Sequence, residues 1–373
     1  MADATSHEHT TRARSETAGP RLALARRYRP KTLSQLIGQP ALQRTLANAV
    51  RSGRQAHAYL FSGTRGTGKT STARILARAL NCEQGPTPEP CGACAQCQAI
   101  LMDRHMDVIE MDAASRTGVD DVRQLIDGIP YAPVQGNCKI YIVDEAHMLS
   151  KNAWNALLKT LEEPPAHAIF VFCTTEPRKV PATVLSRCQR FQLRHIEEAE
   201  LQSLFRSIAK AENADVTPGA LAIVARAAEG SARDGLSILD QLLAAYPDGA
   251  TEDDARSLIG LPDRKRIHEV LEAALSGDAG AALSAWRRLM SNGSDPAQGI
   301  KDLMQRVHEL CVLHAAPGAA ALCGIDTAGA GRPKVPYERL QSAWAVLVKV
   351  SQEMQETPDR TAAGDMAILR LSA

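Results

Sequence analysis

The sequence predicts a parallel, three-layer α/β domain followed by helical domains, and three observations indicate this. From about Arg21 onward, short apolar runs alternate with amphipathic helical stretches, which is the pattern of strands that helices cover on both faces. A glycine-rich segment links the first apolar run to a helix. After about Leu193 the strand signal disappears and only helical periodicity continues.

The strands of the first domain are predicted by segments that are short, apolar and followed by polar or glycine-rich residues. These segments are Ala58–Phe61, Asp107–Met111, Lys139–Val143 and Ala168–Cys173. Between them, Ser71–Leu80 and Ala153–Leu161 predict helices. Residues 1–20 are polar and lack periodicity, so we expect a disordered N-terminal tail. The α/β core is then expected over residues 21–196.

The rest of the chain predicts two helical domains, at residues 197–260 and 261–373. Gly230-Ser231 predicts a boundary between two helices of the first. Two apolar stripes with helical spacing predict helices of the second: Ile267, Val270, Leu271, Ala274 and Leu275, and Ile300, Leu303, Val307 and Leu310. The segment Ala315–Pro336 is rich in glycine, alanine and proline, which predicts a loop.

Composition excludes several classes of protein. At 373 residues, the chain is long enough for two or three domains. The net charge of +1 excludes a broadly basic binder, and the aromatic content of 4% argues against a surface on which bases stack. No apolar run approaches the roughly 20 residues that span a bilayer. The N-terminus has no hydrophobic signal core either, so we expect a cytoplasmic protein without a membrane partner.

A phosphate-binding loop is predicted at Gly63–Thr70, whose sequence GTRGTGKT follows a strand and opens a helix. Glycines let successive N–H groups face phosphate oxygens, and the helix N-terminus adds positive potential. Lys69 can reach the outer phosphates, and the Thr70 hydroxyl can bind Mg²⁺. The expected ligand-binding set is Gly63, Thr64, Arg65, Gly66, Thr67, Gly68, Lys69 and Thr70.

Two carboxylates end the strand KIYIVDE. Asp144 is placed to hold Mg²⁺, and Glu145 can polarise the attacking water as a general base. Together with the phosphate loop, this pair predicts nucleotide hydrolysis. Thr175, after the strand AIFVFC, can orient the same water from the other side, although simple capping of the strand explains this threonine almost as well. Arg187 and Arg233 are candidate cations for the γ-phosphate, yet exposed ion pairs would also account for them.

Four of the nine cysteines lie close together in the sequence, at Cys82, Cys91, Cys94 and Cys97. Four thiolates with two two-residue spacings suit tetrahedral zinc and leave no open coordination position, which is typical of a structural site. The segment 82–97 has little apolar content, so a metal is needed to order it. A redox disulfide pair is the alternative.

Seven ordered segments together resemble the bacterial DNA polymerase III gamma/tau clamp-loader subunits, which are AAA+ ATPases. They are RRYRPKTLSQLIGQ, HAYLFSGTRGTGKTSTARILARALNC, CGACAQC, MDAASRTGVDDVR, YIVDEAHMLSKNAWNALLKTLEEPP, TTEPRKVPATVLSRCQRF and GSARDGLSILDQ. The resemblance extends from about Arg21 to about Leu242. It implies an AAA+ core with a zinc module, a small helical lid and a helical collar, with ATP, Mg²⁺ and structural Zn²⁺ as ligands.

The resemblance also implies a role for each matching residue. Thr175 matches the first sensor and Arg233 the second, while Arg187 in Ser-Arg-Cys matches the finger that enters the ATP site of a neighbouring subunit. The segments lining the adenine end match Tyr28, Arg29 and Pro30, together with Ile37, Gly38 and Gln39. ATP binding and hydrolysis would drive opening and loading of the sliding clamp onto primed DNA, and the chain would have no polymerase active site of its own.

The implied partners are delta, delta prime and further gamma/tau copies in a five-subunit ring, the sliding clamp and primed DNA. Helices matching those of Arg116, Arg123 and Lys159 face the DNA backbone in that complex. Solvated surface charge remains the alternative for all three.

Two alternative functions share motifs with this sequence. Asp144-Glu145-Ala146-His147 spells DEAH, but a helicase of that type needs a second motor domain, and no strand-rich region follows Leu193. A non-enzymatic clamp-loader stator shares Ser-Arg-Cys and the zinc module but lacks a working phosphate loop, against which GTRGTGKT argues.

Overall fold

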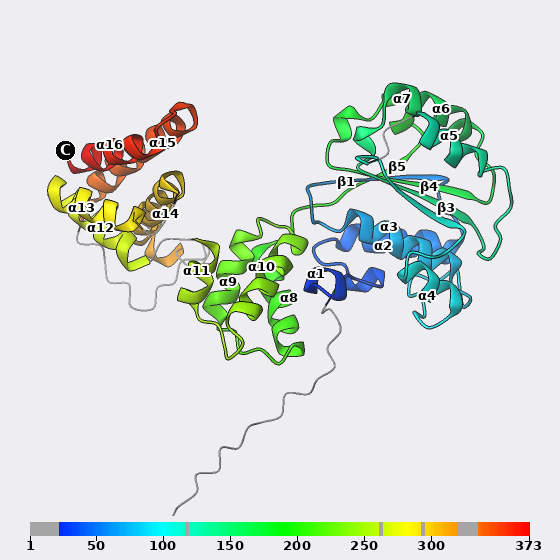
Figure 1. Cartoon of the computed structure of the whole chain (residues 1–373), viewed down its shortest axis with the longest axis horizontal. Coiled ribbons are helices and arrows are strands. Elements are labelled where there is room, and N and C mark those ends of the chain that lie inside the picture. Colours follow the sequence, from blue (N-terminus) through cyan, green and yellow to red (C-terminus); the bar gives the residue numbers. More distant parts are fainter. Residues whose placement is uncertain (1–21, 116–118, 261–263, 292–294, 320–334) are drawn as a thin grey trace, which may run out of the picture. The chain divides into compact units, whose positions relative to one another are not determined.

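The computed structural model describes residues 22–115, 119–260, 264–291, 295–319 and 335–373. It divides into two compact units (Figure 1). The first comprises the chain up to Arg194 together with Ala232–Asp240, and the second comprises His195–Ser231 and Gln241–Ala373. The predicted tail at residues 1–20 and most of the predicted loop at Ala315–Pro336 lie outside the described residues.

A five-stranded parallel sheet forms the centre of the first unit, in the order β2-β3-β4-β1-β5. Its strands are β1 (Ala58–Ser62), β2 (Val108–Asp112), β3 (Lys139–Asp144), β4 (Ala168–Thr174) and β5 (Gln189–Gln192). The four predicted strands are confirmed, each to within one residue at either end. β5 was missed because its sequence QRFQ is mostly polar and its residues are at most half-buried, as befits an edge strand.

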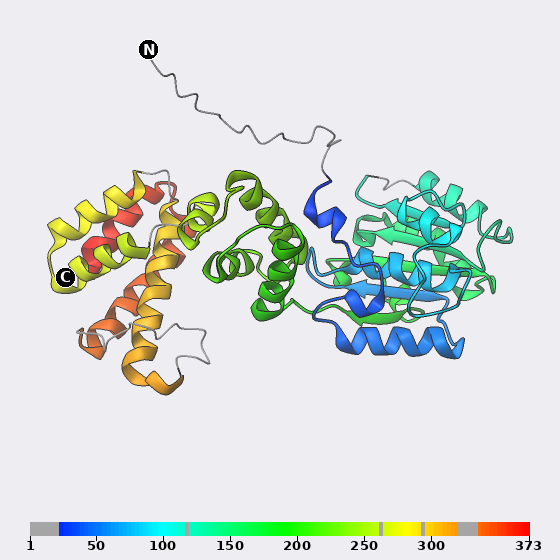
Figure 2. The ribbon, with the colours of Figure 1, turned by 90° about the horizontal axis from the view of Figure 1, so that it is seen from below.

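Helices cover both faces of this sheet, which confirms the predicted three layers (Figures 1 and 2). Tyr59 and Phe61 of β1 pack with α2 and α3, whereas Ala58 and Leu60 face the opposite core, which α5 and α6 complete. The helices of this unit are α1 (Leu24–Arg27), η1 (Leu33–Gln35), α2 (Pro40–Ser52), α3 (Lys69–Asn81), α4 (Ala95–Leu101), α5 (Val119–Asp127), η2 (Ala146–Met148), α6 (Lys151–Glu162), η3 (Pro177–Lys179) and α7 (Ala182–Leu185).

The chain after β5 is helical throughout its described part, apart from one isolated bridge between Val216 and Ala250. Its helices are α8 (Glu198–Ala211), α9 (Pro218–Ala227), α10 (Ala232–Ala245), α11 (Glu252–Ile259), α12 (Arg264–Ser276), α13 (Ala279–Met290), α14 (Pro296–Ala315), α15 (Tyr337–Glu356) and α16 (Arg360–Ser372). The predicted boundary at Gly230-Ser231 is confirmed, since α9 ends before it and α10 begins after it. The described residues thus contain no second sheet of the kind a two-motor helicase requires.

The buried indole of Trp286 lies in the core of the C-terminal helices. Both predicted apolar stripes belong to this core, which confirms their helical periodicity. Gly299 of α14 and Gly364 of α16 approach the indole so closely that a Cβ at either position would lie 2.8 Å from a ring carbon. Among the described helices, none is long and apolar enough to cross a membrane.

Candidate functional site

The predicted phosphate loop connects the end of β1 to the start of α3. Gly63, Gly66 and Gly68 all have positive φ angles, of 149°, 76° and 102°. A Cβ at Gly63 would lie only 2.6 Å from the Leu193 carbonyl oxygen, so this position has no room for a side chain. The backbone path that brings N–H groups toward a phosphate therefore depends on glycine here.

Lys69 is the first residue of α3, and its side chain is buried within the loop. Its Nζ donates hydrogen bonds to the carbonyl oxygens of Gly63 at 3.0 Å and Thr64 at 2.8 Å. Burial lowers the pKa of the ammonium, and the charge of Arg233 acts in the same direction, whereas Glu145 and Asp144 raise it. The loop thus holds a cation close to two carboxylates, at the place where phosphates bind in such motifs.

The two residues predicted to hold Mg²⁺ contact each other directly. Thr70 Oγ1 donates a hydrogen bond of 2.6 Å to Asp144 Oδ2. Strand order explains this contact, because β1 and β3 are separated only by β4 and all three strands end at the same edge of the sheet. A hydroxyl and a carboxylate side by side are the hard oxygen donors that Mg²⁺ prefers, so the residues present fit this ion.

Glu145 follows Asp144 in a left-handed conformation, with φ 45°. Its Oε2 lies 3.4 Å from Thr175 Oγ1, so the structure brings the predicted water-activating carboxylate and the predicted first sensor together. Sequence reasoning missed two further polar groups of this cluster, Thr174 and His147, whose Oγ1 and Nδ1 are 3.1 Å apart. The DEAH pattern contains His147, but in the sequence this pattern indicates only a helicase-type motif.

The two predicted arginines lie in different places. Arg233 is the second residue of α10, in the part of this helix that belongs to the first unit, and its charge acts on both Lys69 and Arg29. Arg187 follows α7, where its guanidinium pairs with Glu162 Oε1 at 2.7 Å and donates to the Thr183 carbonyl oxygen at 2.7 Å. None of these hydrogen bonds or ion pairs links Arg187 to the phosphate loop of the same chain.

A cavity of about 350 Å³ in the first unit brings Arg29, Pro30 and Arg233 together. The other residues that line it are Ala23, Ala25, Arg26, Lys31, Arg74, Ile75, Arg78, Ile100, Leu101 and Asp103. Burial lowers the pKa of Arg29, as do the charges of Arg74 and Arg233. This concentration of cations favours an anionic ligand.

Other residues predicted at the adenine end lie outside this cavity lining. Tyr28 packs under the Arg27 guanidinium, whose Cζ is 5.3 Å from the ring centroid. Ile37 is half-buried. Gly38 has a φ of 72°, and Gln39 is buried, with its Nε2 donating to the Arg194 carbonyl oxygen at 2.8 Å.

The predicted DNA-facing residues are surface residues where they are described. Arg123 of α5 and Lys159 of α6 are both exposed, on helices that pack against each other on one face of the sheet. Arg116 lies outside the described residues.

The four predicted zinc ligands form a compact cluster, since the sulfur atoms of Cys82, Cys91, Cys94 and Cys97 all lie within 4.8 Å of one another. Backbone N–H groups point at these sulfurs; the Cys94 N–H, for example, lies 3.4 Å from Cys91 Sγ. Such donors lower the pKa of the Cys91 thiol to about 6, whereas burial raises that of Cys97 to about 12. All described cysteines are free thiols, and this quartet can hold a metal ion.

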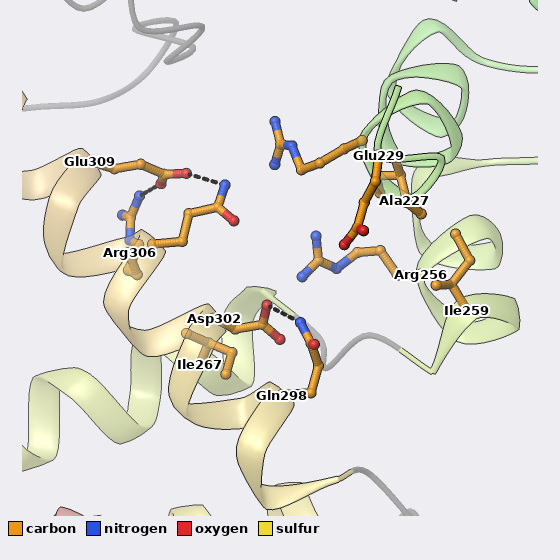
Figure 3. A pocket seen from close by; sticks show the side chains of 12 residues that line it. Ala227, Glu229, Arg256, Ile259, Ile267, Gln298, Asp302, Arg306 and Glu309 are labelled. Atoms are coloured by element: carbon orange, nitrogen blue, oxygen red, sulfur yellow. Dashed lines mark hydrogen bonds and ion pairs between the residues drawn. The ribbon is translucent and has the colours of Figure 1, made fainter. Parts of the chain in front are cut away.

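A second cavity, of about 300 Å³, lies in the second unit between α9, α11 and α14 (Figure 3). Burial raises the pKa of Asp302 on its wall to about 6. Gln298 Nε2 donates to one carboxyl oxygen of Asp302 at 3.1 Å, while the other oxygen, Oδ2, is buried without a hydrogen-bond partner among the described residues. On the same wall, Arg306 pairs with Glu309 at 2.9 Å.

Three family models match successive parts of the chain. The model described as "DNA polymerase III, delta subunit" matches residues 38–197. "DNA polymerase III clamp loader subunit, ATPase lid domain" matches residues 200–246, and "DNA polymerase III subunits gamma and tau domain III" matches residues 250–373.

Curated relatives match over most of the chain. DNA polymerase III subunit tau of Salmonella typhimurium is 39% identical over 356 residues, which cover 94% of this chain and 55% of that protein. Subunit gamma/tau of Mycobacterium tuberculosis is 41% identical, covering 90% and 58%. The chain thus spans little more than half of these relatives. Subunit gamma of Buchnera aphidicola subsp. Baizongia pistaciae is 36% identical, covering 79% of this chain and 80% of its own length. This chain therefore belongs to the DNA polymerase III gamma/tau family.

Proposed function

We propose that this chain is an ATPase motor subunit of a DNA polymerase III clamp loader, in which ATP binding and hydrolysis drive loading of the sliding clamp onto primed DNA. The observation that carries the proposal is the cluster at one edge of the sheet. There the buried Lys69 ammonium lies within the phosphate loop, and Thr70 contacts Asp144 at 2.6 Å. Glu145 follows Asp144 directly in the sequence. Membership of the gamma/tau family supports the cellular role.

Each residue of the cluster has a chemical task in this proposal. The loop N–H groups and Lys69 bind the phosphates. Thr70 and Asp144 would hold Mg²⁺, which neutralises phosphate charge when bound. Glu145 takes a proton from the attacking water, and Thr175, 3.4 Å from Glu145 Oε2, helps to orient that water.

The two arginines would stabilise charge on the γ-phosphate from different subunits. Arg233, whose charge already acts on Lys69, would serve the site of its own chain. Arg187 has no hydrogen bond or ion pair with that phosphate loop and lies on the surface beside Glu162. It is therefore suited to the ATP site of a neighbouring subunit, in a five-subunit ring with delta, delta prime and further gamma/tau copies.

The ring would surround primed DNA and bind its backbone without reading its sequence. The exposed side chains of Arg123 and Lys159 support a phosphate-tracking surface, to which we add Arg116 from the sequence alone. The Cys82, Cys91, Cys94 and Cys97 cluster would hold a structural zinc ion, because four sulfurs leave no open position for catalysis. We divide the chain into an ATPase core at 21–196, a lid at 197–260 and a collar at 261–373.

The test uses the chain assembled with its partner subunits, a sliding clamp and primed DNA. We expect ATP hydrolysis that clamp and DNA stimulate. Lys69→Ala should abolish ATP binding, because it removes the cation that the loop surrounds. Lys210→Ala changes an exposed lysine of α8 and is the matched control. Normal turnover by the Lys69→Ala protein would refute the assignment of the site.

A further inference from the structure

The imidazole of His147 approaches the carboxylates of Glu145 and Glu176, but it has no role in the mechanism proposed above. It belongs to η2, directly after Glu145, and only 8% of its side chain is exposed. Nδ1 lies 3.1 Å from Thr174 Oγ1 and 3.5 Å from Glu145 Oε2, while Nε2 lies 3.5 Å from Glu176 Oε1. One ring thus joins the end of β3 to the end of β4.

One of these contacts, together with one from Thr175, bears on the orientation of Glu145. Its Oε2 is approached by His147 Nδ1 at 3.5 Å and by Thr175 Oγ1 at 3.4 Å. No hydrogen bond or ion pair from the described residues reaches its other oxygen, Oε1. The carboxylate is therefore held at one oxygen, by a group from η2 and a group after β4, which leaves the second oxygen to accept a proton from water.

We propose that His147 is a positioning residue that fixes the orientation of the Glu145 carboxylate through Nδ1. The inference rests on the proposed ATPase function and adds to it a residue to which that proposal gives no part in binding phosphate or metal. Two groups that the His147 ring contacts, Thr174 and Glu176, are themselves held in place by other interactions. Thr174 is fully buried and its Oγ1 accepts the Glu176 N–H at 3.0 Å, and Glu176 pairs with Lys179 at 2.9 Å. A ring held from two elements orients a neighbouring group better than a mobile side chain does.

Two amide substitutions distinguish the contributions of the two ring nitrogens. The Nδ2 of asparagine occupies the position of Nδ1, so His147→Asn can keep the contacts with Glu145 and Thr174. The Nε2 of glutamine occupies the position of the imidazole Nε2, so His147→Gln keeps only the contact with Glu176. A merely space-filling histidine would not distinguish these variants, since both amides are polar and smaller than the ring.

The experiment measures ATP affinity and clamp- and DNA-stimulated turnover in the assembled complex. We expect His147→Gln and His147→Ala to lower kcat about tenfold, because a misplacement of about 1 Å can cost about 100-fold and we expect a smaller displacement of Glu145 here. His147→Asn should keep kcat within about threefold of the original chain. The Kd for ATP should be unchanged in all three, because no hydrogen bond or ion pair among the described residues links His147 to the phosphate loop.

Two controls make the result decisive. His167→Gln alters a half-buried histidine of the same unit, whose Nε2 lies 2.9 Å from the Ile129 carbonyl oxygen, and should leave kcat unchanged. Glu145→Gln should abolish turnover. Melting curves identify any variant that fails to fold, and the asparagine–glutamine pair still decides if His147→Ala does so.

The inference is overturned if all His147 variants turn over at the original rate, or if the asparagine variant is as slow as the glutamine variant. A complex of the unaltered chain that binds no ATP and shows no turnover would overturn the proposed function, and the role of His147 with it. Turnover that Lys69→Ala abolishes but His147 substitutions leave unchanged would overturn the inference alone.

Discussion

Asp302 is a buried carboxyl whose ionisation opposes folding. Burial raises its pKa from 3.8 to about 6, although Gln298, Arg256 and Arg226 act in the opposite direction. A carboxyl with a raised pKa binds its proton more tightly in the folded state. Its contribution to stability is therefore present below pH 3.8 and is lost as the pH rises through about 6.

Asp302→Asn removes this ionisation while keeping the shape of the side chain. We expect the free energy of unfolding of the second unit to rise by about 2 kcal/mol above pH 7, with little change near pH 4. Urea unfolding curves across this pH range measure the difference. Asp248→Asn, which neutralises an exposed aspartate of the same unit, is the control. Equal stability of the Asp302→Asn protein and the original at pH 8 would show that the carboxylate is well solvated.

Individual residues of the site differ in how far the sequence could predict them. Lys69, Thr70, Asp144 and Glu145 were predicted because each belongs to a short motif in which spacing alone implies chemistry. The part played by His147 was missed, because its significance depends on groups from β4. In the sequence, Thr174 is 27 residues away, and nothing local indicates that its hydroxyl lies 3.1 Å from the imidazole.

At the scale of elements, the cysteine cluster leads to a prediction about zinc content and stability. It joins the end of α3 to α4 through a segment rich in glycine and proline, so bound metal should replace the apolar core that this segment lacks. We expect one zinc ion per chain by elemental analysis and none after Cys94→Ser. That substitution should also lower the stability of the first unit by about 2 kcal/mol, or its melting temperature by about 5 °C.

Cys138→Ser is the matched control for this prediction. The sulfur of Cys138 lies 3.6 Å from Asn81 Oδ1, a contact that a serine hydroxyl can keep, and the residue is outside the cluster. Both zinc content and stability should be unchanged. Protein purified without chelator that contains no zinc would overturn the metal assignment.

Elements were predicted well where their periodicity was strong. β1, β3 and β4 are almost wholly buried, β2 contains three apolar residues, and the stripes in α12 and α14 belong to the C-terminal core. β5 was missed because Gln189–Gln192 has two glutamines and an arginine, and only its pairing with β1 makes it a strand. Pairing between segments distant in the sequence is a tertiary interaction, which a local pattern cannot reveal.

At the scale of the whole assembly, the prediction concerns the role of Arg187 in ATP hydrolysis. Its only anionic partner among the described residues is Glu162. In the assembled complex we expect the guanidinium to break this ion pair and to bind at the ATP site of a neighbouring subunit. Arg187→Ala should retain ATP binding but lower DNA-stimulated turnover in the assembled complex at least about 100-fold, the scale of an arginine finger. Steady-state hydrolysis and nucleotide titrations measure the two effects.

Arg178→Ala removes an exposed arginine from the nearby η3 and should leave turnover intact. If Arg187→Ala hydrolyses ATP at the original stimulated rate, the trans role is wrong.

The local sequence was sufficient for the phosphate loop, the carboxylate pair, the cysteine quartet and most strands and helices, because each depends on residues close together in the chain. Tertiary structure decided the rest. The order β2-β3-β4-β1-β5 places β4 between the phosphate-loop strand and the carboxylate strand, and so brings Thr70 to Asp144 and His147 to Thr174. The first part of α10 packs with the first unit and brings the charge of Arg233 to Lys69, and packing around α14 buries a carboxyl oxygen of Asp302. Such contacts join segments that are far apart in the chain, so their geometry arises only when the whole core packs.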